Sequence, residues 1–167
     1  MTPQSPAVAP PPAVFAEAMS LLASGLAIVT SRAPDNGPSG LLVASLCSYS
    51  AAPPSVLVSV QRDCRSHAAL LVAEHFGVHL LRCDQEPAAR TFAGPAARKF
   101  DAIEWSWDGD VPAIAGVIAY LRCARAAVFE HADHAVVIGE VTDARVAGGE
   151  PLCYLRRRMD WRLEPRR

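Results

Sequence analysis

The chain has 167 residues, of which 51% are hydrophobic and 20% charged, and its formal net charge at pH 7 is −1. This length suits a single domain, and so many apolar residues can bury a core without disulfides. A nearly neutral chain lacks the basic surface of a nucleic-acid binder, and no apolar run approaches the roughly 18 residues of a membrane span. We therefore expect neither nucleic acid nor a membrane as a partner.

The first residues read as a leader followed by a helix. Residues 2–12 contain five prolines, a composition typical of a disordered segment. We therefore predict a disordered leader over residues 1–12 and one folded domain over 13–167. Apolar residues recur at helical spacing between Val14 and Ser24, which predicts a helix there, with Gly25 as its C-terminal cap.

The next segments predict strands. Residues 26–31 form a short apolar run, and a turn rich in Pro, Asn and Gly occupies residues 33–39. Residues 40–50 and 55–61 are the next predicted strands. Their apolar residues are continuous rather than alternating, as in a barrel wall that is covered on its outer side.

The rest of the chain adds short helices and the closing strands. Helices are predicted over 66–74, capped by Ser66, and over 84–92, capped by Asp84. Strands are predicted over 76–81, 117–130, 135–146 and 152–155, with an irregular segment over 94–111 and a hairpin turn at Gly148-Gly149. Six or seven strands without a β-α-β alternation favour a mainly β barrel with short helices.

The stretch from Gly37 to His67 carries the strongest chemical signal. Ser45, Ser48 and Ser50 interrupt an apolar strand, where small side chains would let a planar ligand approach the backbone. The Arg65-Ser66-His67 turn then opens a helix, a place that suits a phosphate. A flavin nucleotide needs both a ring seat and a phosphate seat. Alternatively, the serines bond their own backbone and the turn is an ordinary helix start.

An ordered set of motifs spans nearly the whole chain, from about Phe15 to Arg158, and it resembles the flavin reductase-like family of the FMN-binding split barrel. The matching motifs are Gly25-Leu26-Ala27-Ile28-Val29-Thr30, Gly40 to Ser50 with Pro53-Pro54, Arg65-Ser66-His67, Phe92-Ala93-Gly94, Ala132-Asp133-His134, Gly139-Glu140-Val141 and Pro151-Leu152-Cys153-Tyr154.

The resemblance implies a single-domain split β-barrel that reduces FMN or FAD with NADH or NADPH and supplies the product to a partner monooxygenase. It also implies a homodimer. His134 is the candidate catalytic residue, with Asp133 orienting it. The implied cofactor-binding residues are Leu42, Val43, Ala44, Ser45, Ser48, Ser50, Arg65, Ser66, His67 and Phe100. No G-x-G-x-x-G motif is present, so the nicotinamide would be laid on the flavin itself.

Several positions depart from the family pattern. Leu42 stands where Thr is usual, Ala44 replaces Ser or Asn, Leu46 replaces an aromatic residue, and Ala132 replaces the Gly of G-D-H. Two lost hydrogen bonds, at about 0.5–1.5 kcal/mol each, would weaken flavin binding. They also leave open a split barrel that binds a planar ligand for non-reductase chemistry, such as that of an isomerase or cyclase.

Other features allow more than one interpretation. Arg156-Arg157-Arg158 is either a solvated strand end or a contact for a nucleotide phosphate or a partner, and it weakly favours a third hypothesis, a non-catalytic dimeric subunit. Trp105 and Trp107 are either packing anchors or a cover for the ring or dimer.

The cysteines and histidines complete the sequence evidence. His131 and His134 form H-x-x-H, but nothing forces a third ligand beside them, so we expect no metal. The five cysteines are scattered and never form C-x-x-C, which predicts reduced thiols in a cytoplasmic protein. The N-terminus also lacks the layout of a signal peptide.

Overall fold

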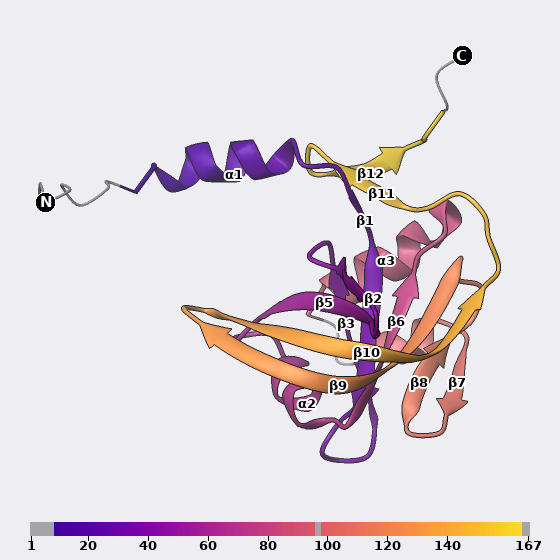
Figure 1. Ribbon diagram of the computed structural model, residues 1–167. Coiled ribbons are helices and arrows are strands. Elements are labelled where there is room, and N and C mark those ends of the chain that lie inside the picture. The colour runs from indigo at the N-terminus through magenta and orange to yellow at the C-terminus, as the bar shows by residue number, and fades with distance from the viewer. Residues whose placement is uncertain (1–8, 96–97, 165–167) are drawn as a thin grey trace, which may run out of the picture.

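The computed structural model describes residues 9–95 and 98–164, and it is built around one curled antiparallel sheet (Figure 1). The seven strands of this sheet lie in the order β3-β2-β6-β9-β10-β5-β4. In chain order they are β2 (Ala27–Arg32), β3 (Pro38–Val43), β4 (Cys47–Ala51), β5 (Pro54–Gln61), β6 (His75–Leu80), β9 (Ala119–His131) and β10 (His134–Val146). The two edge strands, β3 and β4, are consecutive in the chain, so the sheet is split where residues 44–46 join them.

Both faces of β2 are buried, which explains its continuous apolar sequence. Ala27 and Val29 belong to a core cluster with Val58 and Phe76, whereas Leu26 and Ile28 belong to a second cluster with Phe92. The first cluster lies among the strands of the curled sheet. The second lies under α3 (Glu86–Ala93) and the β7–β8 hairpin (Trp105–Asp108 and Val111–Ile114). A strand between two cores needs no polar alternation.

Close packing of α3 on β3 depends on a glycine. A Cβ atom on Gly40 would lie 2.7 Å from Cε1 of Phe92, closer than atoms can pack. Phe92 is almost fully buried and meets Phe100 edge-to-face, with 5.2 Å between the ring centroids. The end of α3 is therefore held directly against β3, beside the split.

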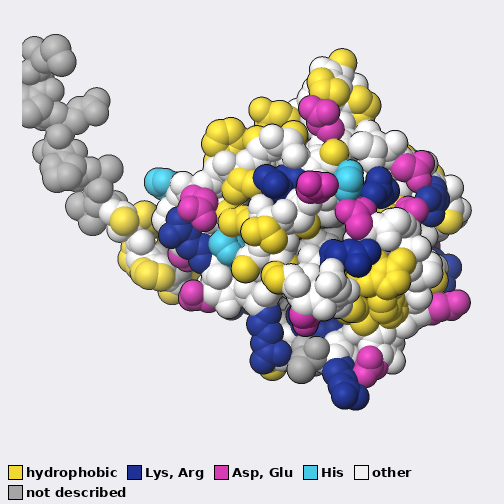
Figure 2. All heavy atoms as spheres, turned by 90° about the horizontal axis from the view of Figure 1, so that it is seen from below, with side chains coloured by type: hydrophobic (Ala, Val, Ile, Leu, Met, Phe, Trp, Pro, Cys, Tyr) yellow, Lys and Arg dark blue, Asp and Glu magenta, His cyan; other side chains and the backbone are white. Residues whose placement is uncertain are grey.

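A smaller unit projects from the barrel (Figure 1). It contains α1 (Pro12–Ser20) and a three-stranded sheet in the order β1-β11-β12, with strands Ser24–Gly25, Cys153–Leu155 and Arg158–Trp161. Within α1 only Ser20 is buried, and Val14, Phe15 and Met19 are exposed. Hydrophobic side chains accordingly cover the segment next to the grey N-terminal residues in Figure 2, whereas charges of both signs are dispersed over the rest of that face.

The structure confirms the mainly β, single-domain split-barrel fold and corrects several elements. The predicted strand over residues 40–50 is two strands, because residues 44–46 carry the chain from the β2 side of the sheet to the β5 side. The segment predicted to be irregular contains the β7–β8 hairpin and a 3₁₀ turn, Lys99–Ala102. Trp105 and Trp107 lie in this hairpin as packing contacts, with 5.3 Å between their ring centroids.

Three further predictions, of a helix end, a helix cap and a hairpin turn, are also wrong. The first helix ends at Ser20, and Gly25 is a β1 residue rather than a cap. Asp84 does not cap α3, because its carboxylate pairs with Arg82 over 2.7 Å. Residues 148–149 are no hairpin turn, since they join β10 to β11 in a different sheet.

The N-terminal prediction is only partly covered by the structure. Of the predicted leader, residues 1–8 lie outside the described residues, and α1 begins at Pro12. No helix in the described part of the chain has both the length and the apolar character to span a membrane.

Candidate functional site

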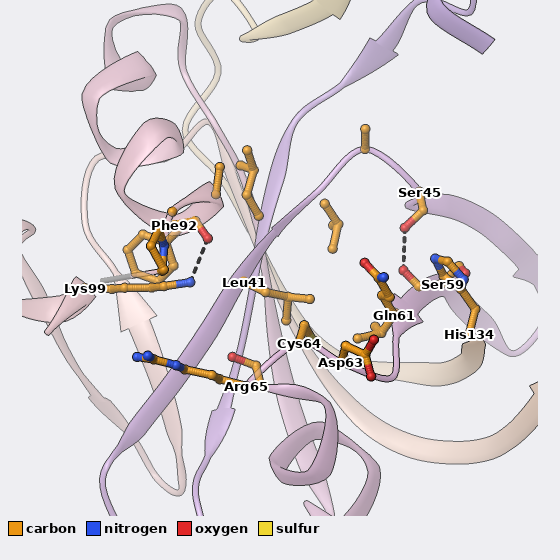
Figure 3. Close-up of a pocket in the computed structure, with 18 residues that line it drawn as sticks. Leu41, Ser45, Ser59, Gln61, Asp63, Cys64, Arg65, Phe92, Lys99 and His134 are labelled. Carbon is orange, nitrogen blue, oxygen red and sulfur yellow. Dashed lines mark hydrogen bonds between the residues drawn. The ribbon is translucent and has the colours of Figure 1, made fainter. Parts of the chain in front are cut away.

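A cleft of about 590 Å³ opens where the two edges of the main sheet separate. Figure 3 shows Ser45, Ser59 and His134 at one end of it and Arg65 and Lys99 at the other. Its volume lies within the range of about 300–1,000 Å³ that is usual for small-molecule sites. The lining residues are Leu41, Leu42, Val43, Ala44, Ser45, Ser59, Val60, Gln61, Asp63, Cys64, Arg65, Ser66, Phe92, Ala93, Gly94, Pro95, Lys99 and His134.

The open edge of β3 supplies backbone hydrogen-bonding groups to this cleft. In the β2–β3 hairpin the Ala33 N–H donates to the Gly37 carbonyl over 2.9 Å, and hydrogen-bonded pairs alternate along an antiparallel ladder. By the register Thr30↔Gly40 and Ile28↔Leu42, Gly40 and Leu42 fall on the non-bonded pairs. Their N–H and C=O groups therefore face away from β2. Leu42, which lines the cleft, presents a free backbone donor and acceptor there.

The three candidate serines are separated by the break between β3 and β4. Ser45 lies in the cleft, where its hydroxyl donates to the Ser59 carbonyl over 2.7 Å (Figure 3). Ser48 and Ser50 lie on β4 and border a different, largely apolar groove. The Ser50 hydroxyl accepts a hydrogen bond from the Ala52 N–H. The structure thus brings only Ser45 to the cleft.

The Arg65-Ser66-His67 turn reaches the cleft through its first two residues. Ser66 is the N-cap residue of the following helix, as predicted, but its buried hydroxyl makes no capping bond and instead donates to the Gly40 carbonyl over 2.9 Å. This bond ties the start of α2 (His67–Val72) to the edge of β3. The Arg65 guanidinium makes no hydrogen bond or ion pair within residues 9–95 and 98–164. His67 does not line the cleft, and its buried Nε2 atom has no hydrogen-bond partner.

Lys99 is a site residue that the sequence analysis missed. Its ammonium donates to the Phe92 carbonyl over 2.8 Å and borders the cleft at the same end as Arg65 (Figure 3). Burial lowers the pKa of this ammonium, and an anion beside it would raise that pKa again. An ammonium has three donors, so two remain for a ligand. The available signal was that Lys99 is the only lysine of the chain.

His134 lies at the other end of the cleft, next to the turn between β9 and β10. Its Nδ1 atom lies 2.9 Å from Oδ1 of Asp133, and this bond lowers the pKa of the exposed Asp133 carboxyl. The Arg62 N–H donates to the Asp133 carbonyl over 2.9 Å and fixes the turn to the end of β5. Since Nδ1 is occupied, Nε2 is the ring nitrogen available to a ligand. Asp133 itself does not line the cleft.

Phe100 lies outside the cleft, in a second cavity of about 370 Å³. This cavity adjoins the first, because Arg65, Ser66 and Lys99 line both. Its other walls are the β2–β3 turn, the first half of β3 and the segment around Phe100.

The remaining candidates lie elsewhere. Arg156 and Arg157 line none of these cavities. In the described residues no group of three or more His, Cys, Asp or Glu side chains could hold a metal ion. All five cysteines are unpaired.

The cleft thus unites seven predicted residues: Leu42, Val43, Ala44, Ser45, Arg65, Ser66 and His134. It adds Ser59, Gln61 and Lys99, which the sequence analysis did not single out. Gln61 faces His134 in the β5–β10 register, so it could have been found from the strand pairing alone.

A sequence model described as "Flavin reductase like domain" matches residues 19–161, most of the chain. The chain belongs to the flavin reductase-like family. The match includes both ends of the cleft, from β3 to the residues around His134.

Relatives of this flavin reductase-like chain include an FMN reductase (NADH) of Agrobacterium fabrum, 37% identical over 84% of the chain and 80% of the relative. A flavin reductase (NADH) of Kitasatospora aureofaciens is 39% identical over 86% of the chain and 78% of the relative. Among solved structures, the NADH:FAD oxidoreductase of Streptomyces globisporus, in complex with NAD and FAD fragments, has a TM-score of 0.86 and 31% identity. This match covers 96% of the chain and 98% of that structure.

Proposed function

We propose that this protein is an NAD(P)H-dependent flavin reductase that reduces FMN or FAD and supplies the product to a separate monooxygenase. One observation carries the proposal: a single cleft joins an open strand edge to a pair of cations that have no carboxylate partner among the described residues, in a chain whose relatives are flavin reductases that use NADH. A relative named as the reductase component of a 4-nitrophenol monooxygenase, from Rhodococcus opacus and 36% identical, supports the transfer to a partner.

The cleft fits a flavin nucleotide along its whole length. The isoalloxazine ring would lie against the open edge of β3, where the backbone N–H of Leu42 could donate to its polar rim. Ser45 can accept a further hydrogen bond, because its own proton is directed at Ser59. At the other end Arg65 and Lys99 bind the phosphate.

The departures at Leu42 and Ala44 are therefore compatible with flavin binding. Both residues lack a side-chain hydrogen-bonding group, but the unpaired backbone of β3 at Leu42 remains available to the ring. Fewer side-chain hydrogen bonds reduce affinity rather than abolish it, at about 0.5–1.5 kcal/mol each. Weak binding suits a protein that releases reduced flavin.

Hydride transfer from the nicotinamide to the flavin is chemistry that the two nucleotides supply once they are stacked. The chain has to hold the rings in contact and keep water from them. His134 would donate a hydrogen bond or a proton from Nε2 to the reacting pair, a role supported by its position in the cleft and by its bond to Asp133, which orients the ring. Burial raises the pKa of the Cys64 thiol, which disfavours the thiolate that a nucleophilic role would need.

We also propose that the protein is a homodimer of the cytoplasm. In a single chain, α1 exposes Val14, Phe15 and Met19, and a helix of nine residues is unstable in water without packing. A second copy would cover this apolar surface. Five unpaired cysteines support a reducing compartment. Light scattering on the purified chain tests the dimer, and a monomeric mass would refute it.

Anaerobic mixing of the protein, NADH and a flavin tests the function directly. The absorbance of oxidised flavin should fade at a rate that saturates with flavin concentration. Addition of an oxygen-dependent monooxygenase component, its substrate and oxygen should then yield hydroxylated product without direct addition of reduced flavin. An unchanged flavin spectrum under these conditions would refute the proposal.

A further inference from the structure

The second cavity continues the cleft along the same strand. Residues 41–43 of β3 line the cleft and residues 38–40 line the second cavity. Since a strand rises about 3.3 Å per residue, these six residues span about 20 Å. Ser66 covers the edge of β3 at Gly40, where its hydroxyl bonds the carbonyl, and Arg65, Ser66 and Lys99 line both cavities. One extended ligand could therefore pass from the cleft to the second cavity over these three residues.

The boundary between the two cavities is cationic. Arg65 and Lys99 line both cavities, and neither forms an ion pair with a carboxylate in the described part of the chain. Lys99 has one acceptor, the Phe92 carbonyl, and Arg65 has none. A single phosphate needs only some of the N–H donors of Arg65 and Lys99, whereas a diphosphate between two ring systems would use all of them.

The second cavity offers the groups that a nucleoside needs. The Asp35 carboxylate accepts from the Gly37 N–H over 3.0 Å through one oxygen, which leaves the other for a ribose hydroxyl. Arg98 borders the cavity, and its side chain is 87% exposed and only 3.8 Å from Asp101 in a loose ion pair. Its guanidinium is free to stack on a planar base.

We propose that the second cavity holds the adenosine half of FAD, so that the protein selects FAD over FMN; this inference rests on the proposed flavin reductase function. Arg65 and Lys99 then meet the diphosphate, Asp35 accepts a hydrogen bond from the ribose, and Arg98 covers the adenine. FMN ends at the boundary and gains nothing from Asp35 or Arg98.

Equilibrium titration with FAD, FMN and riboflavin tests the assignment, using the full chain and the variants Asp35→Ala and Arg98→Ala. The wild-type Kd for FAD should be at least about tenfold lower than the Kd for FMN. One good charge-assisted hydrogen bond contributes a difference of this size. Each variant should reduce this ratio by about 3- to 10-fold through a higher Kd for FAD. Both side chains are exposed, and unchanged melting temperatures would show that the variants fold.

Arg90→Ala is the matched control. Arg90 is also an exposed arginine in a short-range ion pair, with Glu86, but it lines neither cavity. Its removal should leave the FAD-to-FMN ratio unchanged. If Arg90→Ala lowered the ratio by a similar factor, the effect of Arg98→Ala would be explained by the general loss of a positive charge. That result would overturn the assignment.

Three other results would overturn the proposal. FMN would bind as tightly as FAD, or the two variants would keep the wild-type ratio, or they would raise the KM for NADH with FMN as acceptor. The last result would assign the cavity to the adenosine of the nicotinamide nucleotide. Saturable FMN reduction without FAD preference would refute only the second cavity's role, whereas absence of turnover with every flavin would refute the reductase function itself.

Discussion

Nδ1 of His134 lies 2.9 Å from Oδ1 of the preceding residue, Asp133, at the end of the tight turn that brings the histidine to the cleft. The bond directs Nε2 as the free nitrogen and holds the ring at the cleft end opposite Arg65 and Lys99 (Figure 3). The geometry separates two tasks, since the cations bind the nucleotide and the histidine acts on the rings.

Replacement of His134 by Ala should therefore reduce turnover more than binding. We expect kcat to fall by about 100-fold, the lower range of acid–base contributions, while the Kd for flavin changes by less than about threefold. Steady-state kinetics and flavin titration measure the two effects. His131→Ala is the matched control, because this exposed histidine pairs with His134 across the turn but lines neither the cleft nor the second cavity, and it should keep the wild-type kcat. Equal losses in both variants would contradict the role of His134.

The ammonium of Lys99 should matter for the phosphate and not for the ring. Lys99→Gln should raise the Kd for FMN by about tenfold, because a charge-assisted hydrogen bond is lost, and leave the Kd for riboflavin unchanged. Lys99→Arg, which keeps the positive charge, should recover part of the FMN affinity. If riboflavin and FMN lost affinity in parallel, the side chain would have a structural role instead.

A strained alanine in the β9–β10 turn predicts a stabilising substitution. Ala132 has a φ of 50°, a left-handed conformation that costs a residue with a Cβ atom about 1–2 kcal/mol. Part of this is offset by the flexibility of glycine in the unfolded chain, so Ala132→Gly should stabilise by about 0.5–1 kcal/mol and raise Tm by about 2 °C.

The reverse substitution is available as a control. Gly148 has a φ of 76° and nothing within 4 Å of an added Cβ, so Gly148→Ala should lower Tm through backbone strain alone. Calorimetry of both variants measures the pair. A lower Tm for Ala132→Gly would show that the turn conformation differs from the one described.

Acid should destabilise the protein through His79. This residue is fully buried, and desolvation lowers its pKa to about 4, although its hydrogen bond to the Ile28 carbonyl opposes the shift. The unfolded chain binds the proton near pH 6.5, so stability is independent of this group above that pH and falls as pH drops from 6.5 to 4. The loss reaches about 3 kcal/mol below pH 4.

The pH dependence of unfolding distinguishes His79 from the carboxylates that titrate in the same range. Urea unfolding of the wild type and His79→Gln at several pH values gives two slopes of stability against pH. The slope of the variant between pH 6.5 and 4 should be shallower, whatever its absolute stability. Identical slopes would mean that His79 does not carry the effect.

Sequence patterns predicted the strands whose burial is uniform, and failed where a distant contact decides the local structure. β2 was predicted because both of its faces are buried, so that every residue from Ala27 to Val29 is apolar. The break at residues 44–46 carries no glycine or proline. It arises because Cys47 and Ser48 pair with β5, a contact that the local sequence does not contain.

The same contrast holds for the candidate site. Arg65 lies in a turn and His134 directly follows one, as the first residue of β10, and their motifs marked them. Ser48 and Ser50 share the motif of Ser45 but leave the cleft at the break in the strand. Lys99 enters the cleft because the segment around it packs on α3, and a single lysine has no pattern that could predict this contact.

NADH oxidation as a function of added flavin, on protein purified without flavin, tests the central claim most directly. The account predicts no turnover without flavin, and saturable turnover with FMN or FAD that falls in His134→Ala. NADH oxidation that is independent of flavin, or none at any flavin concentration, would contradict it, and the second result would favour a planar-ligand protein with different chemistry.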